Sequence, residues 1–394
     1  MAETFNLSEF VIPGTYVQVR AEGLIGVGGV STGNVGIVGT ARVPKLDAQG
    51  RPVVEGGNPV FDEALYGVTR VVPDYKGAVE TFGRYDKSTP GTGTGQRNLT
   101  RALELLFAGG ARTVYARAVP PGAAAADFQS AFLELLKEDV NLLVAPELPT
   151  EAAMTMFATV VETGENTSRD VIAVVGSDGA DTATVASIRA EADPNPRLIL
   201  AAPAVIAAET LVDEQGKVDA NNVRLSGTYT AATVAGLLAT LAPQSSPTNK
   251  PVRGVARVAR KFAYGEVKDL ISGGVLVLED RLGTRVVRGV TTEQATDGPF
   301  RQVTTRRIVD FAKAGIRRAS NPFIGRLNNQ RVRKALRGAI DGFLNTMVQD
   351  EALITYTLDV TATRQDEINN RAIVNVVLQP TFSIDFIAVT LVLQ

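Results

Sequence analysis

The chain has 394 residues, with 40 Lys and Arg against 42 Asp and Glu, and a formal net charge of −2. It contains no Cys, His or Trp, which excludes disulfides, thiolate chemistry, His-ligated metals and a Ser-His-Asp triad. The length predicts two or three domains with a large core. We therefore expect a globular protein without catalytic residues, metal or cofactor, although an enzyme that uses carboxylates or Lys stays open.

Neither a signal peptide nor a membrane-spanning helix is predicted. Residues 1–10 carry two acids and no base, which is the opposite of a signal peptide. The longest nearly unbroken apolar run, 198–208, contains a proline and is too short to cross a bilayer. We expect a protein that remains in the cytoplasm where it is made, with no membrane insertion.

The first hundred residues mix two short strands with glycine-rich and loop-rich sequence. Val17 and Val19 alternate with polar neighbours, which predicts a strand at 16–20. A glycine-rich run follows and ends in an apolar strand at 35–38. Residues 41–97 predict a loop-rich insertion because Pro and Gly punctuate them throughout.

Helices and strands alternate from about residue 98 to 290. The helical patterns cover 98–108, 127–138, 150–162, 181–191, 229–241 and 265–272. Short apolar strands lie between them at 113–119, 141–145, 171–175, 198–201 and 275–278. Apolar strands that alternate with helices predict a largely parallel sheet covered on both faces, an α/β core.

The last hundred residues follow a different order. Helices are predicted at 301–319 and 329–349, followed by strands at 353–363, 371–379 and 386–393, which indicates a separate α+β domain. The final strand is apolar on both faces, so it must be buried in its own domain or paired with another chain. Its residues are Phe386, Ile387, Ala388, Val389, Thr390, Leu391, Val392 and Leu393.

One motif suggests catalysis, and its context argues against it. Residues 29–33, Gly-Val-Ser-Thr-Gly, match the G-x-S-x-G nucleophile elbow. That elbow requires a strand-to-helix turn and a His that accepts the Ser proton, and the chain has no His. We interpret these residues as a loop. No Walker A loop is present, because the one Gly-Lys pair, 216–217, lacks the upstream Gly and is followed by Val.

Positive charge is concentrated between residues 301 and 337, a segment that contains eleven basic residues and one acidic residue. Such a block on two helices is typical of a surface that binds a polyanion or an acidic protein, including another copy of the chain. A solvated cationic face is the alternative. Few aromatic residues interrupt the block and it matches no nucleic-acid-binding module, so nucleic acid is an open but less favoured partner.

An ordered series of short motifs resembles the contractile tail sheath proteins of phages, tailocins and related injection systems. Residues 13–17 (PGTYV) are similar to the opening of that family, and 101–118 to its helix, glycine turn and strand. The segments 233–250, 266–278 and 289–292 resemble its central motifs, and 323–329 (FIGRLNN) its Y-I-G-K-x-x-N segment. Residues 42–97 match poorly, and their role stays unassigned.

The resemblance implies an architecture and a function. It implies an N-terminal interlocking arm at 1–26, a peripheral α/β domain at 27–300 with a non-catalytic, subtilisin-like arrangement, and an inner α+β domain at 301–394. Hexameric rings would stack helically around an inner tube and contract to drive the tube through a target cell envelope. The baseplate and tail terminator would be further partners, in a virion or injection-system particle assembled in the bacterial cytoplasm.

The resemblance also implies roles for particular residues. The arm and the last strand of different subunits would join the C-terminal domain of a third, so that extended β-arms link the rings. The strand residues at the two ends are Tyr16, Val17, Gln18, Val19 and Arg20, together with the residues from Phe386 to Leu393. The bases expected to contact the tube or a neighbouring subunit are Arg326, Arg331, Arg333, Lys334 and Arg337. A carboxylate- or Lys-dependent α/β enzyme and a basic nucleic-acid-binding protein are the alternatives.

Overall fold

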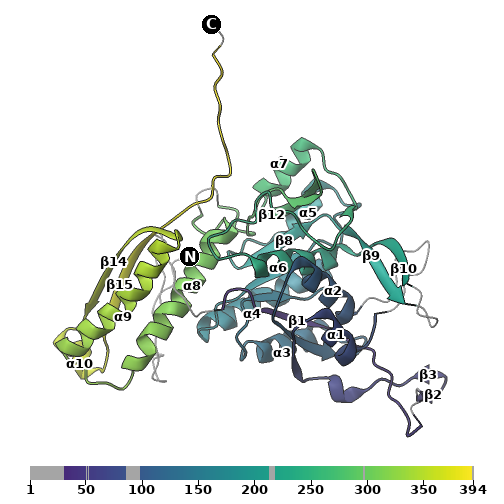
Figure 1. Cartoon of the computed structure of the whole chain (residues 1–394), viewed down its shortest axis with the longest axis horizontal. Coiled ribbons are helices and arrows are strands. Elements are labelled where there is room, and N and C mark those ends of the chain that lie inside the picture. The colour runs from purple at the N-terminus through teal and green to yellow at the C-terminus, as the bar shows by residue number, and fades with distance from the viewer. Residues whose placement is uncertain are drawn as a thin grey trace. The chain divides into compact units, whose positions relative to one another are not determined.

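A computed structural model describes residues 31–49, 51, 53–85, 98–212, 218–295 and 298–392. The chain divides into two compact units, whose described parts are shown in Figure 1. The α/β unit comprises 33–241 and 247–296. The C-terminal unit comprises the residues from 297 onward, the short segment 242–246 and the chain up to Thr32.

An eight-stranded sheet forms the centre of the α/β unit, in the order β13-β12-β8-β7-β6-β1-β5-β4. The six inner strands run parallel, whereas the edge strands β4 and β13 pair antiparallel. This confirms the parallel α/β core that the apolar strands predict. The strands are β1 (Val35–Thr40), β4 (Thr69–Val72), β5 (Val114–Val119), β6 (Leu142–Val144), β7 (Ile172–Gly176), β8 (Leu198–Ala202), β12 (Val275–Asp280) and β13 (Thr284–Val286).

Seven helices of the described residues accompany this sheet. Helices α3, α4, α5 and α7 share one apolar cluster with alternate residues of the parallel strands, and α6 packs on β6, β7 and β8 and against α2. Glycines allow α2 and α6 to approach closely, because a Cβ on Gly109 would lie 2.9 Å from the Cα of Gly236. The helices are α1 (Tyr75–Phe82), α2 (Leu99–Gly109), α3 (Ala125–Leu135), α4 (Thr150–Asn166), α5 (Val185–Glu191), α6 (Thr230–Thr240) and α7 (Tyr264–Ser272).

Two regions of the α/β unit differ from the sequence prediction. The predicted loop-rich insertion contributes β4 to the main sheet and helix α1, whose Ala78 and Phe82 are buried. A second, three-stranded sheet was not predicted, because the apolar start of β9 continues the run that begins in β8. The remaining strands and 3₁₀ helices are β2 (Val54–Glu55), β3 (Asn58–Pro59), β9 (Val205–Val212), β10 (Val218–Arg224), β11 (Arg257–Val258), η2 (Glu63–Leu65) and η3 (Gly227–Tyr229).

The C-terminal unit packs two long helices and a two-stranded sheet around its own small core. Helices α8 and α9 cross closely, because a Cβ on Gly315 would lie 1.7 Å from the ring of Phe343. Asn329 begins α9 by accepting a hydrogen bond from the N–H of Val332. The elements are α8 (Val303–Ser320), η4 (Asn321–Phe323), α9 (Gln330–Gln349), β14 (Leu353–Thr361), α10 (Arg364–Ile368) and β15 (Ile373–Pro380).

The strand predicted at 386–393 is not formed within the chain. Residues 381–392 follow β15 as an irregular segment outside every helix and strand of the described residues. A strand needs a second backbone to pair with, so pairing of this segment with another chain stays a prediction. No helix among the described residues is long and apolar enough to span a membrane.

Candidate assembly surfaces

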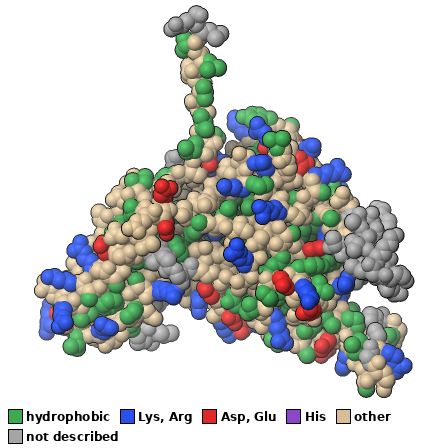
Figure 2. Space-filling view, viewed as in Figure 1, with side chains coloured by type: hydrophobic (Ala, Val, Ile, Leu, Met, Phe, Trp, Pro, Cys, Tyr) green, Lys and Arg blue, Asp and Glu red, His purple; other side chains and the backbone are tan. Residues whose placement is uncertain are grey.

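The C-terminal tail, residues 381–392, carries large apolar side chains into solvent. It leaves the end of β15 as a single extended segment (Figure 1), and apolar side chains follow it along its length (Figure 2). Phe386 is 78% exposed, Val389 74% and Leu391 86%. All the tail residues predicted to form the last strand, from Phe386 to Val392, are exposed, whereas Leu393 lies outside the described residues.

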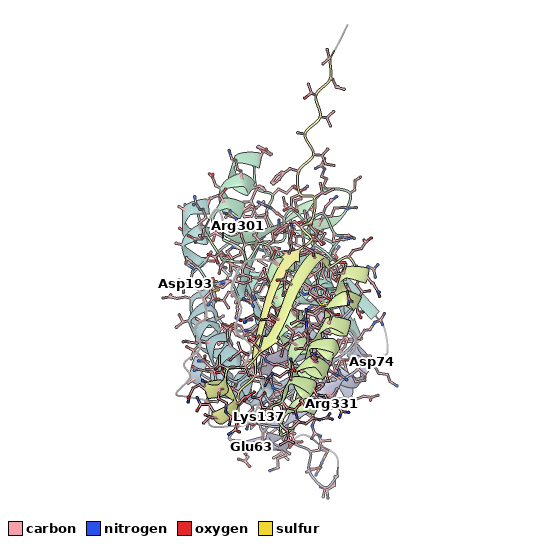
Figure 3. The ribbon with its side chains drawn as sticks, turned by 90° about the vertical axis from the view of Figure 1, so that its left-hand side faces the viewer. Glu63, Asp74, Lys137, Asp193, Arg301 and Arg331 are labelled. Carbon is pink, nitrogen blue, oxygen red and sulfur yellow. The ribbon has the colours of Figure 1, made fainter. Side chains whose placement is uncertain are left out.

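The sheet of the C-terminal unit consists of β14 and β15, which pair antiparallel. Figure 3 shows these two strands side by side against α9. Leu358, Val376 and Leu378 lie on the inner face, in or against the core of this unit. Among the described residues no further strand joins either edge. A sheet of two strands is marginal by itself, and each open edge offers unpaired N–H and C=O groups to another strand.

Part of the basic block is buried, which corrects the expectation that the whole block faces a partner or solvent. Arg306, Arg307 and Lys313 of α8 are buried. Arg306 forms an ion pair with Asp310 and stacks over Phe300, with 4.2 Å between the guanidinium carbon and the ring centre. Long cationic side chains can be buried in this way when their heads find hydrogen bonds or an aromatic face.

Arg307 makes two backbone contacts that the sequence did not indicate. Its guanidinium donates to the carbonyl of Thr32 at 3.0 Å and to that of Ala242 at 3.4 Å. Burial lowers the pKa of Arg307 to about 10, so the side chain remains charged at neutral pH. Thr32 and Ala242 flank the first segment of the α/β unit, 33–241, so Arg307 fixes both ends of that segment to α8.

The bases predicted for a tube or subunit contact lie on and just before α9, and four of them are exposed: Arg326, Arg331, Lys334 and Arg337. Figure 3 labels Arg331 near the beginning of this helix. Arg333 differs, since it pairs with Glu367 of α10 at 3.0 Å and donates to the side-chain oxygen of Asn328 at 2.9 Å. Arg333 therefore links α10 to α9. The four exposed bases do not take part in this link.

The predicted strand of the N-terminal arm, Tyr16 to Arg20, lies outside the described residues. Of the G-x-S-x-G match at 29–33, the structure describes only the residues from Ser31 onward. Ser31 precedes β1, whereas a nucleophile elbow follows a strand and opens a helix. The local order is therefore the reverse of the one that catalysis by this motif requires.

The carboxyl ends of β1 and β6 form the switch point of the parallel sheet, where α/β proteins commonly bind ligands. Glu147 fills this position. One of its carboxylate oxygens accepts from the N–H of Thr40 at 2.7 Å and the other from the Thr40 hydroxyl. Gly39 makes room, since a Cβ there would lie 2.5 Å from the carboxylate. Burial raises the pKa of Glu147 to about 7, against the opposing effect of the Thr40 hydrogen bonds.

No cluster of acidic side chains suited to a metal ion occurs within the ranges that the structure describes. The features that stand out are instead an apolar tail, a sheet with open edges and a row of exposed bases. Exposed apolar segments and open sheet edges are typical of surfaces that contact other chains.

Comparison with known proteins identifies the family. The central domain of phage tail sheath proteins matches residues 122–292, and the phage tail sheath C-terminal domain matches residues 295–394. These two matches cover more than half of the chain, which therefore belongs to the phage tail sheath family. As a member of this family the chain is a structural subunit of a contractile sheath. No curated protein matches the chain.

Solved structures share the fold over nearly the whole chain. The helical sheath of the anti-feeding prophage in its contracted state has a TM-score of 0.68 and 18% identity, with 97% of this chain and 99% of that chain covered. The sheath complex of the extracellular contractile injection system PVC, also contracted, has a TM-score of 0.67 and 17% identity, with coverages of 97% and 98%. The sheath tail protein of Listeria innocua has a TM-score of 0.64 and 12% identity, with coverages of 91% and 94%.

Proposed function

We propose that this chain polymerises as stacked hexameric rings around an inner tube, in a phage tail or injection-system particle. Contraction of the sheath then drives the tube through the envelope of a target cell. The observation that carries the proposal is that one chain combines an exposed apolar tail, 381–392, with a two-stranded sheet whose edges no other strand of the described residues joins. One chain thus holds both a strand to donate and an edge to receive one.

The physical basis is strand addition between subunits. The tail of one subunit and the arm of another, through Tyr16 to Arg20, extend the β14–β15 sheet of a third. Each added backbone hydrogen bond contributes about 0.5–1.5 kcal/mol net. Burial of tail side chains such as Val389 and Leu391 adds to this at about 25 cal/mol per Å² of apolar surface. The marginal two-stranded sheet becomes a four-stranded one.

The same exchange propagates into a tube. A contact that is head-to-tail and does not close on itself generates a helical assembly. We place residues 27–300 at the periphery, in a subtilisin-like arrangement without catalytic function, and 301–394 on the inside. The glycine-rich residues 23–33 act as a tether that lets the bodies move while the strand links persist. The work of contraction comes from energy stored at assembly, and the chain itself catalyses no reaction.

Inside the sheath, the exposed bases of α9 contact the tube. Arg331, Lys334 and Arg337 recur every three residues and so follow one side of the helix. Exposed ion pairs are individually weak, so many such contacts can release one after another as the sheath widens. At the two ends of the tube, copies of this chain would contact a baseplate and a tail terminator.

Two truncations test the strand exchange. Removal of residues 382–394, or separately of 1–22, should leave folded protein that forms no long tubes in negative-stain microscopy. A third variant keeps the full length and replaces Phe386, Val389 and Leu391 by Ser. It retains the backbone of the tail but loses its apolar side chains, so it should form few tubes. Long, normally contracting tubes from both truncated proteins would rule out the exchange.

Charge reversal tests the contact with the tube. Lys334→Glu combined with Arg337→Glu should reduce co-sedimentation of the sheath with tubes of the inner tube protein. Arg333 is kept because its pair with Glu367 is internal. Lys76→Glu, an exposed base of α1 in the other unit, is the control. Equal loss of binding in the control and the α9 variant would contradict a specific contact through α9.

A further inference from the structure

Four bases of the α/β unit gather around the turn between β12 and β13. We call this the basic turn surface. The turn's own Arg281 donates its N–H to the carbonyl of Gly283. The segment that carries Arg253 runs beside β13, where Val252 donates to Thr284 at 2.8 Å. The members of the surface are Arg253, Arg257, Lys261 and Arg281.

The four exposed bases outnumber the acids at this end of β12, which are the half-buried Glu279 and Asp280. Asp280 stands at its centre, but its carboxylate already accepts from the N–H of Val258 at 3.2 Å and from the Thr284 hydroxyl at 2.9 Å. Lys261 reaches the same carboxylate at 4.0 Å. Figure 2 shows Lys and Arg side chains collected over α7 and β12. A surface of this kind raises the local concentration of an anionic partner.

Two large apolar side chains project from this region. Leu282, at the tip of the turn, is 94% exposed, and Tyr264, the first residue of α7, is 89% exposed. Tyr and Arg are the residue types enriched at the energetic centres of protein interfaces. An apolar tip among cations is more typical of a protein contact than of a surface for a polyanion.

An acidic surface lies on α3 and α4 of the same unit. Glu151 and Glu162 are eleven residues apart on α4, which is three helical turns, and the exposed Thr155 and Thr159 lie between them on the same side. The exposed carboxylates of this acidic helix surface belong to Asp127, Glu134, Asp139, Glu151 and Glu162. Its bases are Lys137, which pairs with Glu134 at 2.7 Å, and Arg169.

The two surfaces lie at different positions along the eight-stranded sheet. Helix α3 packs on β1 and β5 and α4 on β7 and β8, whereas α7 packs on β12 beside the edge strand β13. The four bases lie on β11, in the loops beside it and in the β12–β13 turn, at the β13 end of the sheet, whereas the acidic helices cover strands nearer its centre. Such a polarity matches a head-to-tail contact, in which the acidic part of one molecule meets the basic part of the next.

We infer that the basic turn surface docks on the acidic helix surface of a second copy of this chain. The contact rests on the proposed polymerisation and adds a link between α/β units to the exchange of strands. Leu282 and Tyr264 supply apolar burial at its centre, and the charges set its register. The contact should weaken as salt concentration rises, because its charges are exposed.

A charge-swap experiment in full-length protein tests this contact. Arg257→Glu with Arg281→Glu reverses the basic turn surface, and Glu151→Lys with Glu162→Lys reverses the acidic one. At low salt, each double variant should raise the protein concentration needed for tube formation by about tenfold, which corresponds to about 1.4 kcal/mol. The four substitutions combined should restore assembly close to that of the unaltered protein, since the complementarity is then re-established.

Arg70→Glu with Arg112→Glu is the matched control, because it removes two exposed bases elsewhere in the α/β unit and should leave assembly unchanged. Far-UV circular dichroism confirms that each variant is folded. Double variants that assemble like the control, or a combined variant as weak as either pair alone, would overturn the contact. Loss of retention on heparin by the Arg257 and Arg281 variant with unchanged assembly would also overturn it, in favour of a polyanion. Unaltered protein that forms no tubes would instead refute the proposed function itself.

Discussion

The two units of this chain complete their folds to very different extents. In the α/β unit, six parallel strands lie inside an eight-stranded sheet and helices bury their side chains. In the C-terminal unit, two strands cover one side of α9, and the following segment carries Phe386 and Val389 exposed. The contrast is that the larger unit buries its apolar strands within its own fold, whereas the smaller one leaves a run of large apolar side chains exposed.

Buried charge sharpens the same contrast. In the α/β unit, Arg197 is enclosed with Asp170 at 2.9 Å and Glu165 at 2.8 Å, which gives the cation two carboxylates within its own fold. In the C-terminal unit, Arg307 instead donates to the backbone of Thr32 and Ala242, where the chain passes to the other unit. Arg197 is thus paired with carboxylates inside its own unit, whereas Arg307 holds the backbone where the chain passes from one unit to the other.

Removal of a core aromatic residue should have the largest effect on monomer stability. Phe157 is fully buried on α4 and its ring centre lies 4.8 Å from that of Phe132. Phe157→Ala should lower the free energy of unfolding of the α/β unit by about 3–5 kcal/mol, through lost burial and a cavity. Urea denaturation followed by far-UV circular dichroism measures this. Phe382→Ala, at an exposed tail position, should change the same quantity little, and equal losses would break the comparison.

The half-buried Glu147 should make the stability of the α/β unit depend on pH. Its pKa is raised from 4.5 to about 7 in the folded chain, so the folded state holds the proton more tightly than the unfolded state. This stabilisation is complete below pH 4.5 and is lost as the pH rises to 7, by about 3 kcal/mol at most.

Glu147→Gln tests that dependence, because the amide does not titrate: its oxygen can accept from the Thr40 N–H while its NH2 donates to the Thr40 hydroxyl oxygen. Unfolding free energies measured from pH 4.5 to 7 should fall less steeply in this variant than in the unaltered protein. The exposed Glu162→Gln is the control and should follow the unaltered protein. Identical slopes in all three proteins would show that burial does not perturb Glu147.

Neighbouring bases on α9 should differ in their structural effect. Arg333→Ala removes the pair with Glu367 and the bonds to Asn328, so the thermal midpoint of the C-terminal unit should fall by about 1–2 °C. Lys334→Ala, at an exposed position, should leave the midpoint unchanged. Differential scanning calorimetry distinguishes the two, and equal midpoints would mean that α10 is held without Arg333.

A single polar residue in the tail should have the smallest effect on the monomer and a clear effect on the assembly. Val389→Ser should change the free energy of unfolding by less than about 0.5 kcal/mol, because the side chain is exposed in the single chain. Tube formation should require more protein, since the buried strand of the polymer loses apolar area. Tubes that form at the original concentration would contradict burial of Val389 in a neighbouring subunit.

Much of the fold could be predicted from local pattern. The parallel strands are continuous apolar runs because both of their faces are covered, and the helices between them end at residues such as Gly110, which has a φ of +110°. The hairpin of β9 and β10 was missed, since Val205 and Ala207 extend the apolar run of β8. Strand β4 was hidden in a loop-rich stretch, because only its pairing with β5 distinguishes it.

The candidate surfaces show the same division. The apolar run at 386–393 predicts a strand but does not indicate which strand it pairs with. In the structure the described tail lies outside every strand of its own chain. A count of bases between 301 and 337 could not separate Arg306, which is buried, from Arg331, which is exposed. That separation depends on which side of α8 packs inward and on which carbonyls lie within reach.

The sequence alone determined that the chain contains no His or Cys, that helices and strands alternate, and that residues 386–393 are an almost unbroken apolar run. These properties are local, because they depend on residue type and periodicity along the chain. Tertiary structure alone decided which bases are buried, which edges of the β14–β15 sheet are open, and that Glu147 fills the switch point of the large sheet. Those outcomes depend on contacts between residues far apart in sequence, whose burial and hydrogen bonding exist only once the layers have packed.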